Sequence, residues 1–177
     1  MKAFASKNWA LAGIALAGLM GFSHSILAYS PVGTFPAGPG IVDFPGFSPL
    51  TCNGTFTISV APGGAATIVG ASFTGGSTLC SFTTITGPWT IGPATLVSPG
   101  VYRMTISNIQ FTIRQPPPNS AIVESCVGSV VATLDQNPVP HRLTFSGTLT
   151  MTMPLAGQPC PFRTGLSSYL PTPLTAP

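Results

Sequence analysis

The chain has 177 residues, of which 44% are hydrophobic and only 5% are charged, and its formal net charge is +3. Lys2 and Lys7 supply two of the six basic residues, so the rest of the chain carries four arginines against three acids. Without a basic patch for phosphates, nucleic-acid binding is disfavoured. Without an acidic cluster, a calcium site is not expected.

The first 28 residues have the features of a secretory signal peptide. A short basic region precedes an apolar run of small and aliphatic residues at 9–22, and small residues stand at Ser25 and Ala28. The run is too short and wrongly flanked for a stable membrane anchor, although an uncleaved anchor is the alternative. We expect cleavage after Ala28, or else after Ser25, and export of a mature chain that has no transmembrane segment.

Proline and glycine dominate the next segment, residues 29–49. Since proline breaks helices and donates nothing to a β-ladder, we expect an extended arm with at most a short edge strand at 40–44. The last residues, 166–177, contain three prolines and predict a flexible polyproline-type tail. The expected organisation is therefore signal peptide 1–28, arm 29–49, a single β domain 50–165 and tail 166–177.

Within the β domain, apolar and hydroxylated residues alternate. In residues 143–153 (LTFSGTLTMTM) every odd position is apolar or Gly and every even position is Thr or Ser, which is typical of a strand with one buried face. Residues 55–60 repeat the pattern with Phe56, Ile58 and Val60 inward, and 67–74 continue it with Ile68 and Phe73 inside. A change of phase at Asn108 predicts a bulge or a strand that crosses between sheets.

Further strands are expected at 81–86, 94–97 and 120–134, and no window after residue 28 has a helical period. Many short strands between Gly and Pro turns predict an all-β fold, either an antiparallel β-sandwich or a partly open barrel. Trp89 follows an apolar strand at a turn. We expect it in the core, with an exposed apolar anchor as the alternative.

All four cysteines lie in the exported part, and an even number there predicts two disulfides. The chain has no C-x-x-C pair, which disfavours a zinc site. Residues 52–56 and 126–130 share the pattern C-x-G-[ST]-apolar, and each begins a predicted hairpin that closes on another cysteine. Because the open ends of a hairpin lie together, the favoured pairs among three connectivities are Cys52–Cys80 and Cys126–Cys160.

The groups needed for catalysis are sparse. His141 is the only imidazole after the signal peptide, and no G-x-S-x-G motif is present. Of the three carboxylates, Asp43 lies in the arm, Asp135 lies in a turn where Asp bonds locally, and Glu124 is expected to face solvent or an arginine. We therefore expect no enzyme, with no catalytic, cofactor-binding or metal-binding residue and no cofactor.

Residues 50–160 resemble a known family. The likeness rests on Leu50-Thr-Cys52 entering a Thr-rich strand, on ASFTGG at 71–76 followed by Cys80, and on Pro88-Trp89. The chain resembles the small secreted proteins described as activators of alkane oxidation in pseudomonads and relatives, but differs in its Pro-rich ends and in residues 114–119. The resemblance implies a non-enzymatic extracellular protein that helps cells grow on hydrocarbons by aiding contact with the oil or its dispersal. It brings no catalytic residues.

Two other functions stay open. Thr-rich strands with few charges lack the residues that prevent edge pairing, so the chain would suit a self-associating matrix, filament or biofilm surface protein. In that case residues 40–44 would add a strand to a neighbour. An adhesin or carbohydrate-binding module is the third hypothesis, although no exposed aromatic platform is evident. The expected partner is thus a hydrocarbon, an oil–water interface or another copy of the chain.

Overall fold

The computed structural model describes residues 29–44, 49–138, 140–163, 168–170 and 175–176. The expected signal peptide lies outside the described residues. In this described part of the chain, eleven strands and one short 3-10 helix follow one another: β1 (Gly33–Phe44), β2 (Leu50–Val60), β3 (Ala66–Thr74), η1 (Thr78–Phe82), β4 (Thr83–Ile85), β5 (Trp89–Ile91), β6 (Thr95–Ser98), β7 (Val101–Arg114), β8 (Ile122–Asp135), β9 (His141–Met153), β10 (Pro159–Arg163) and β11 (Ser168–Leu170).

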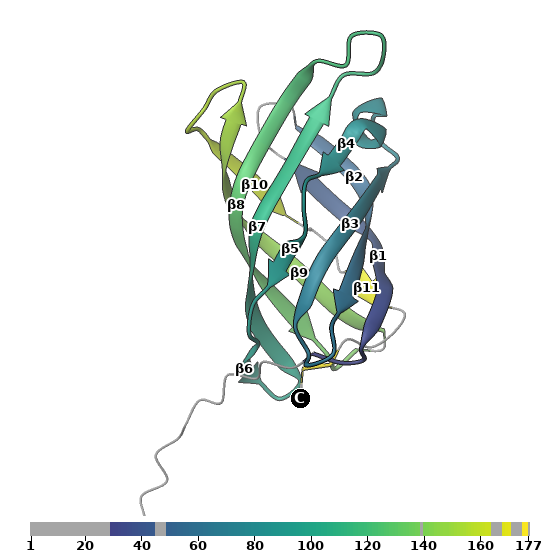
Figure 1. Cartoon of the computed structure of the whole chain (residues 1–177), viewed down its shortest axis with the longest axis vertical. Helices are drawn as coiled ribbons and strands as arrows, with labels where there is room; N and C mark the ends of the chain where they lie inside the picture. Colours follow the sequence, from purple (N-terminus) through teal and green to yellow (C-terminus); the bar gives the residue numbers. More distant parts are fainter. Residues whose placement is uncertain (1–28, 45–48, 139, 164–167, 171–174, 177) are drawn as a thin grey trace, which may run out of the picture.

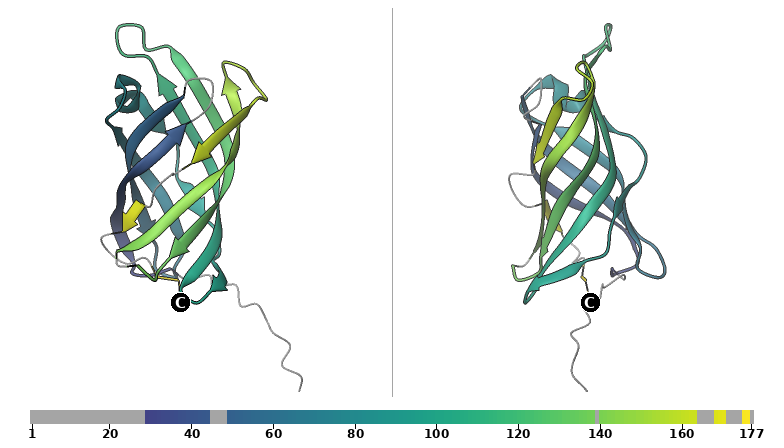
Figure 2. Two further views of the ribbon diagram at one scale, coloured as in Figure 1. Left: turned by 180° about the vertical axis from the view of Figure 1, so that it is seen from behind. Right: turned by 90° about the vertical axis from the view of Figure 1, so that its left-hand side faces the viewer.

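The strands form a closed antiparallel barrel. Its ring runs β1-β2-β3-β5-β7-β8-β9-β10, and β10 returns to β1 where Arg163 pairs with Asp43. The short strands β4 and β6 pair with β7 on either side of β5, and β11 pairs with the start of β9 (Figures 1 and 2). The predicted all-β fold is confirmed, and of the two expected architectures the structure has the barrel, with its ring closed.

The alternating strands bury the residues that the sequence assigned to the inside. Phe56, Ile58 and Val60 are at most 2% exposed, and the apolar residues of β9 up to Met151 are buried as well. Threonine occupies many outward positions, where its branched side chain suits the pleated surface and its hydroxyl stays in water. The period of two therefore placed these side chains correctly.

Asn108 explains the change of phase in β7. It has a positive φ of 59°, and the pairing with β8 shifts between Ile106 and Ile109, both of which are buried. An extra residue at this point keeps both isoleucines inside the barrel. Of the two predicted explanations, the structure has the bulge.

Most of the segment expected to be an arm is a strand of the barrel. β1 pairs with β2 from Gly33 to Phe44, whereas the sequence predicted a strand only at 40–44. The pairing is broken between Ala37 and Gly40, so the Gly-Pro step at 38–39 falls outside the ladder. Among the residues that the structure describes, the other side of β1 has one paired position, with β10, and so tolerates residues that lack an N–H.

The expected flexible tail also contributes structure. β11 extends the pairing of β9 over Leu143, Arg142 and His141, and Thr175 forms a bridge with Ser30. Ala176 is 4% exposed. A proline-rich composition predicted no strand here, because the partner that orders the tail lies far away in sequence.

Candidate functional site

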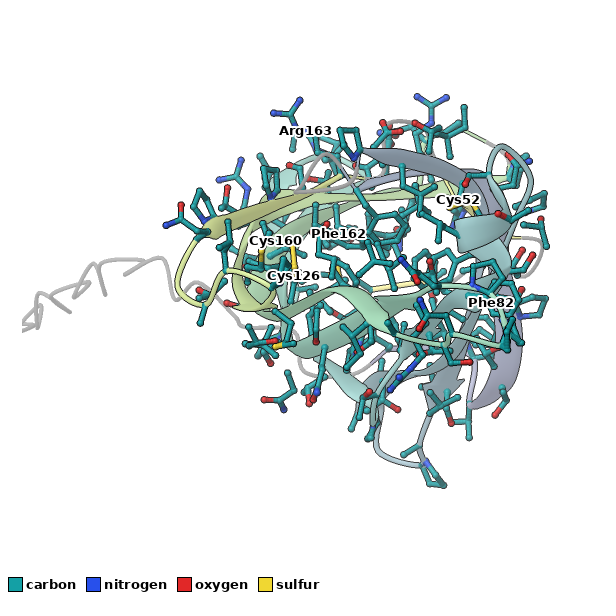
Figure 3. The ribbon with its side chains drawn as sticks, turned by 90° about the horizontal axis from the view of Figure 1, so that it is seen from above. Cys52, Phe82, Cys126, Cys160, Phe162 and Arg163 are labelled. Carbon is teal, nitrogen blue, oxygen red and sulfur yellow. A yellow bond between two sulfur atoms is a disulfide. The ribbon has the colours of Figure 1, made fainter. Side chains whose placement is uncertain are left out.

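Aromatic side chains fill the barrel interior. Phe44 contacts three phenylalanines with ring centroids 4.9–5.5 Å away, and Phe162 points into the ring when the barrel is viewed from above (Figure 3). Trp89 is fully buried and contacts Phe56 and Phe162, which confirms its expected place in the core. The indole N–H of Trp89 has no hydrogen-bond partner among the described residues. Such an interior is a packed core of the kind that small barrels have.

The structure contains the two disulfides that the sequence favoured. Cys52 in β2 joins Cys80 in η1, with Cα atoms 5.7 Å apart, and Cys126 in β8 joins Cys160 in β10, at 6.3 Å. Since β9 lies between β8 and β10, the second disulfide crosses the inner side of β9. Cys80 lies in η1 itself, and Cys126 lies in the part of β8 that begins at the same end of the barrel (Figure 1). Both bonds are drawn in the view from that end (Figure 3).

Glu124 corrects one prediction. The sequence placed it in solvent or beside an arginine, but it is fully buried, with its Oε1 atom 3.1 Å from Cys160 Sγ and 3.4 Å from Cys126 Sγ. The spacing could have shown this, because residues 124 and 126 share one face of a strand and the cysteine points inward. Metal binding by cysteine requires thiolates, so the three side chains do not form a metal site while the disulfide is intact.

The other groups considered for catalysis lie on different strands. Asp43 is in β1 and accepts a hydrogen bond from the Thr51 hydroxyl at 2.8 Å. Asp135 ends β8 and accepts bonds from the backbone and the side chain of Asn137, both at 3.0 Å, as expected for an Asp in a turn. His141 begins β9. These contacts support local structural roles.

Two hairpins form an apolar surface at one end of the barrel. We call it the crown and define it as two ranges (Figures 1 and 2). The first is 115–122, the turn after β7 and the first residue of β8, and the second is 153–158, the last residue of β9 and the turn before β10. Its large apolar side chains are 36% exposed at Ile122, 46% at Met153 and 53% at Leu155. The alternation of β9 predicted Met153 on the inner face, but this residue lies beyond the packed core.

The crown is uncharged and internally bonded. Residues 115–123 and 143–162 contain no Asp, Glu, Lys, Arg or His. In the first hairpin the Gln115 N–H donates to the Ala121 carbonyl at 2.8 Å, and in the second the Gly157 N–H donates to the Met151 carbonyl at 2.8 Å. Ser125 pairs with Met153, which joins the base of the two hairpins. Arg114, the residue before the first hairpin, donates from its guanidinium to the Ser120 carbonyl at 3.3 Å. The crown is thus an ordered surface whose own residues are uncharged, with one arginine beside it.

A further observation concerns helices. No helix among the described residues is both long enough and apolar enough to cross a bilayer.

Comparison with known proteins gives one match. Residues 1–173 match the family described as alkane oxidation protein activator PraA/PraB-like. No curated protein and no solved structure matches the chain. The match spans both Pro-rich ends and the residues 114–119, which the sequence resemblance had left outside.

Proposed function

Since the chain belongs to the alkane oxidation protein activator PraA/PraB-like family, we propose that it is an exported, non-enzymatic accessory protein that contacts hydrocarbon through its crown. Contact of this kind would help cells to reach or to disperse the oil. The family description supports a role in alkane oxidation, and the crown supplies a surface suited to it.

The observation that carries the proposal is the exposure of Ile122, Met153 and Leu155 in two hairpins whose own residues carry no charge. Transfer of apolar side chains from water to an oil surface is favourable in proportion to the area removed from water. A charged group moved with them would oppose the transfer, because ions lose hydration in an apolar medium. The residues of the crown carry no charge, so this penalty concerns only Arg114 beside them.

The Cys126–Cys160 disulfide prepares the crown for contact. Cys126 lies four residues after Ile122, and Cys160 lies five residues after Leu155, so the bond joins the bases of the two hairpins. A surface that is ordered beforehand loses less conformational freedom on binding. Adsorption would then not require unfolding of the barrel.

The direct experiment measures the tension of a hexadecane–water interface as the purified protein is added. We expect wild-type protein to lower the tension and to prolong the lifetime of an emulsion. The variant Ile122→Ser/Met153→Ser/Leu155→Ser should lose most of this effect while keeping the fold.

The matched control is Val32→Ser/Val69→Ser/Leu96→Ser, which removes three residues of similar exposure from three separate places on the barrel. This control should behave like wild type. Equal losses in the two triple variants would show that the crown is not the contact surface. A wild-type protein that leaves the interfacial tension unchanged would overturn the proposed function.

Export is part of the proposal and has its own test. We expect the protein in the medium of a growing culture, with an amino-terminal sequence that begins at Tyr29. Sizing of the same sample separates a free factor from a self-associated form. Recovery of the full chain from the cytoplasm would contradict export.

A further inference from the structure

A hollow of about 280 Å³ lies on the outer wall over β6, β7 and β8, away from the crown. The hollow forms because the segment between β5 and β6 turns away from the barrel surface. The Gly92 N–H donates to the Thr105 carbonyl at 2.8 Å, and the chain then turns away through Pro93. A side chain at Gly92 would begin only 3.1 Å from that carbonyl, so glycine permits the approach. The lining residues are Pro93, Thr95, Val97, Arg103, Met104, Thr105 and Val131.

The hollow has an apolar side. Val97 is 53% exposed and Val131 is 50% exposed, on a wall whose outward residues are mostly hydroxylated. The pairing of β6 with β7 shifts between Leu96 and Ser98, which leaves Val97 outside the regular ladder. Val131 pairs with Thr105, on the other side of the hollow. Two aliphatic side chains therefore flank the opening across β7.

Arg103 gives the hollow its charge. It is the only ionisable residue in the lining, and among the described residues its guanidinium makes neither a hydrogen bond nor an ion pair. The nearest acid along the same face of β8 is Asp135, which bonds to Asn137. Arg103 is therefore available to an anion from solution.

A second hollow provides a comparison. It measures about 320 Å³, and its lining contains both Arg163 and Asp43, which are paired in register between β10 and β1. A carboxylate placed there would meet the carboxylate of Asp43. The first hollow has an arginine in its lining and no acid, so the two differ in the ligand charge that they favour.

We infer that the Arg103 hollow binds a single-chain alkyl carboxylate. The guanidinium would donate hydrogen bonds to the carboxylate head, since its planar donors match the two carboxylate oxygens. The alkyl chain would lie along Val97 and Val131, and the hydroxyls of Thr95 and Thr105 would face the head group. This site is separate from the crown, and its ligand is an ionic amphiphile instead of bulk oil.

The test is calorimetric titration of the purified protein with dodecanoate below its micelle-forming concentration. We expect saturable binding of about one molecule, which Arg103→Gln weakens by about tenfold or more because a charge-assisted pair is lost. Arg103→Lys should retain part of the affinity, and Val97→Ser/Val131→Ser should weaken binding while leaving the head-group contact. The matched control, Arg163→Gln, should bind like wild type.

Other probes distinguish the ligand class. Dodecyltrimethylammonium has the same chain with a cationic head and should not bind, and 1-dodecanol should bind more weakly than dodecanoate. Equal affinity of wild type and Arg103→Gln for dodecanoate would overturn the inference, as would equal binding of the cationic amphiphile. If the protein lowers interfacial tension but shows no saturable dodecanoate binding, only the inference about the Arg103 hollow is overturned, and the proposed function stands.

Discussion

The two ends of the barrel are held together by different means. At the crown end, Cys52–Cys80 and Cys126–Cys160 link segments that are not neighbours in the ring. At the opposite end, the Tyr29 N–H donates to the Gly64 carbonyl at 2.8 Å, and the Tyr29 hydroxyl donates to the Gly92 carbonyl at 2.6 Å. Covalent bonds stabilise the first end, and hydrogen bonds from the segment that contains Tyr29 stabilise the second.

More hydrogen bonds join the turns at the Tyr29 end. The Gln136 N–H donates to the Gly100 carbonyl at 2.8 Å, and the Ser30 and Thr175 backbones bond to each other at 2.8 and 3.1 Å. Disulfides act largely by restricting the unfolded chain, whereas these bonds act only in the folded state. We therefore expect the Tyr29 end to open first when the barrel is destabilised.

The largest expected effect is loss of the Cys126–Cys160 disulfide. Cys126→Ala/Cys160→Ala should lower the free energy of unfolding by about 3 to 4 kcal/mol, as estimated from the loop that the bond closes. Urea unfolding followed by tryptophan fluorescence measures this. The control is Cys52→Ala/Cys80→Ala, which removes a disulfide that closes a loop of similar length. We expect this control to lose less stability, because Glu124 packs against Cys126–Cys160 and not against Cys52–Cys80. A larger loss in the control would contradict this ranking.

Tyr29→Ala should have the next largest effect. Tyr29 is 4% exposed at its end of the barrel, and removing a buried aromatic ring costs about 3 kcal/mol. Hydrogen exchange should show the loss first in the turns near Gly64 and Gly92. Uniform loss of protection over the whole barrel would show that the two ends do not open separately.

Tyr29→Phe isolates the hydroxyl. The Gly92 carbonyl loses its donor, so we expect a loss of about 1 kcal/mol at neutral pH. Burial also raises the pKa of the Tyr29 phenol above its ordinary value of 10.0. The stability that depends on a neutral Tyr29 phenol is therefore fully present below about pH 10. It is lost as the pH rises further, because the phenol ionises in the unfolded chain before it ionises in the folded protein. Wild type should lose more stability than Tyr29→Phe between pH 9 and 11, and parallel curves would contradict this assignment.

The smallest effect on stability is expected at the crown. Ile122→Ser, Met153→Ser and Leu155→Ser each replace an exposed side chain, and such changes stay within about 0.5 kcal/mol. Thermal unfolding of each single variant measures this. A loss several times larger would mean that the crown supports the barrel instead of serving as a contact surface.

The sequence predicted the local features of the fold well. The period of two in β2 and β9 placed their buried residues, and the phase change at Asn108 located the bulge. Pairing between distant segments was harder to predict. β1 and β11 were assigned to an arm and a tail because proline and glycine argue against strands, and the partners that stabilise them, β2 and β9, are not visible in a local window.

The candidate site was predictable only in part. The lack of charged residues within the two crown segments is evident in the sequence, but the exposure of Met153 depends on where the packed core ends, which is a property of the whole barrel. The hollow at Arg103 depends on the departure of the chain at Pro93 and on the neighbouring Val131, which is 38 residues further along. No short sequence motif predicts that these distant residues lie together.

The position of the four arginines has a practical consequence. Arg103 and Arg142 lie within β7 and β9, Arg114 and Arg163 are the last residues of β7 and β10, and no lysine follows Lys7. A trypsin-like protease needs an extended, accessible segment on each side of a basic residue. Cleavage at Arg103 or Arg142 would require a strand to leave the closed ring, so the rate of cleavage at these two residues should report the opening of the barrel. Where such proteases are abundant, strands that are rich in threonine and poor in arginine and lysine contain few cleavage sites.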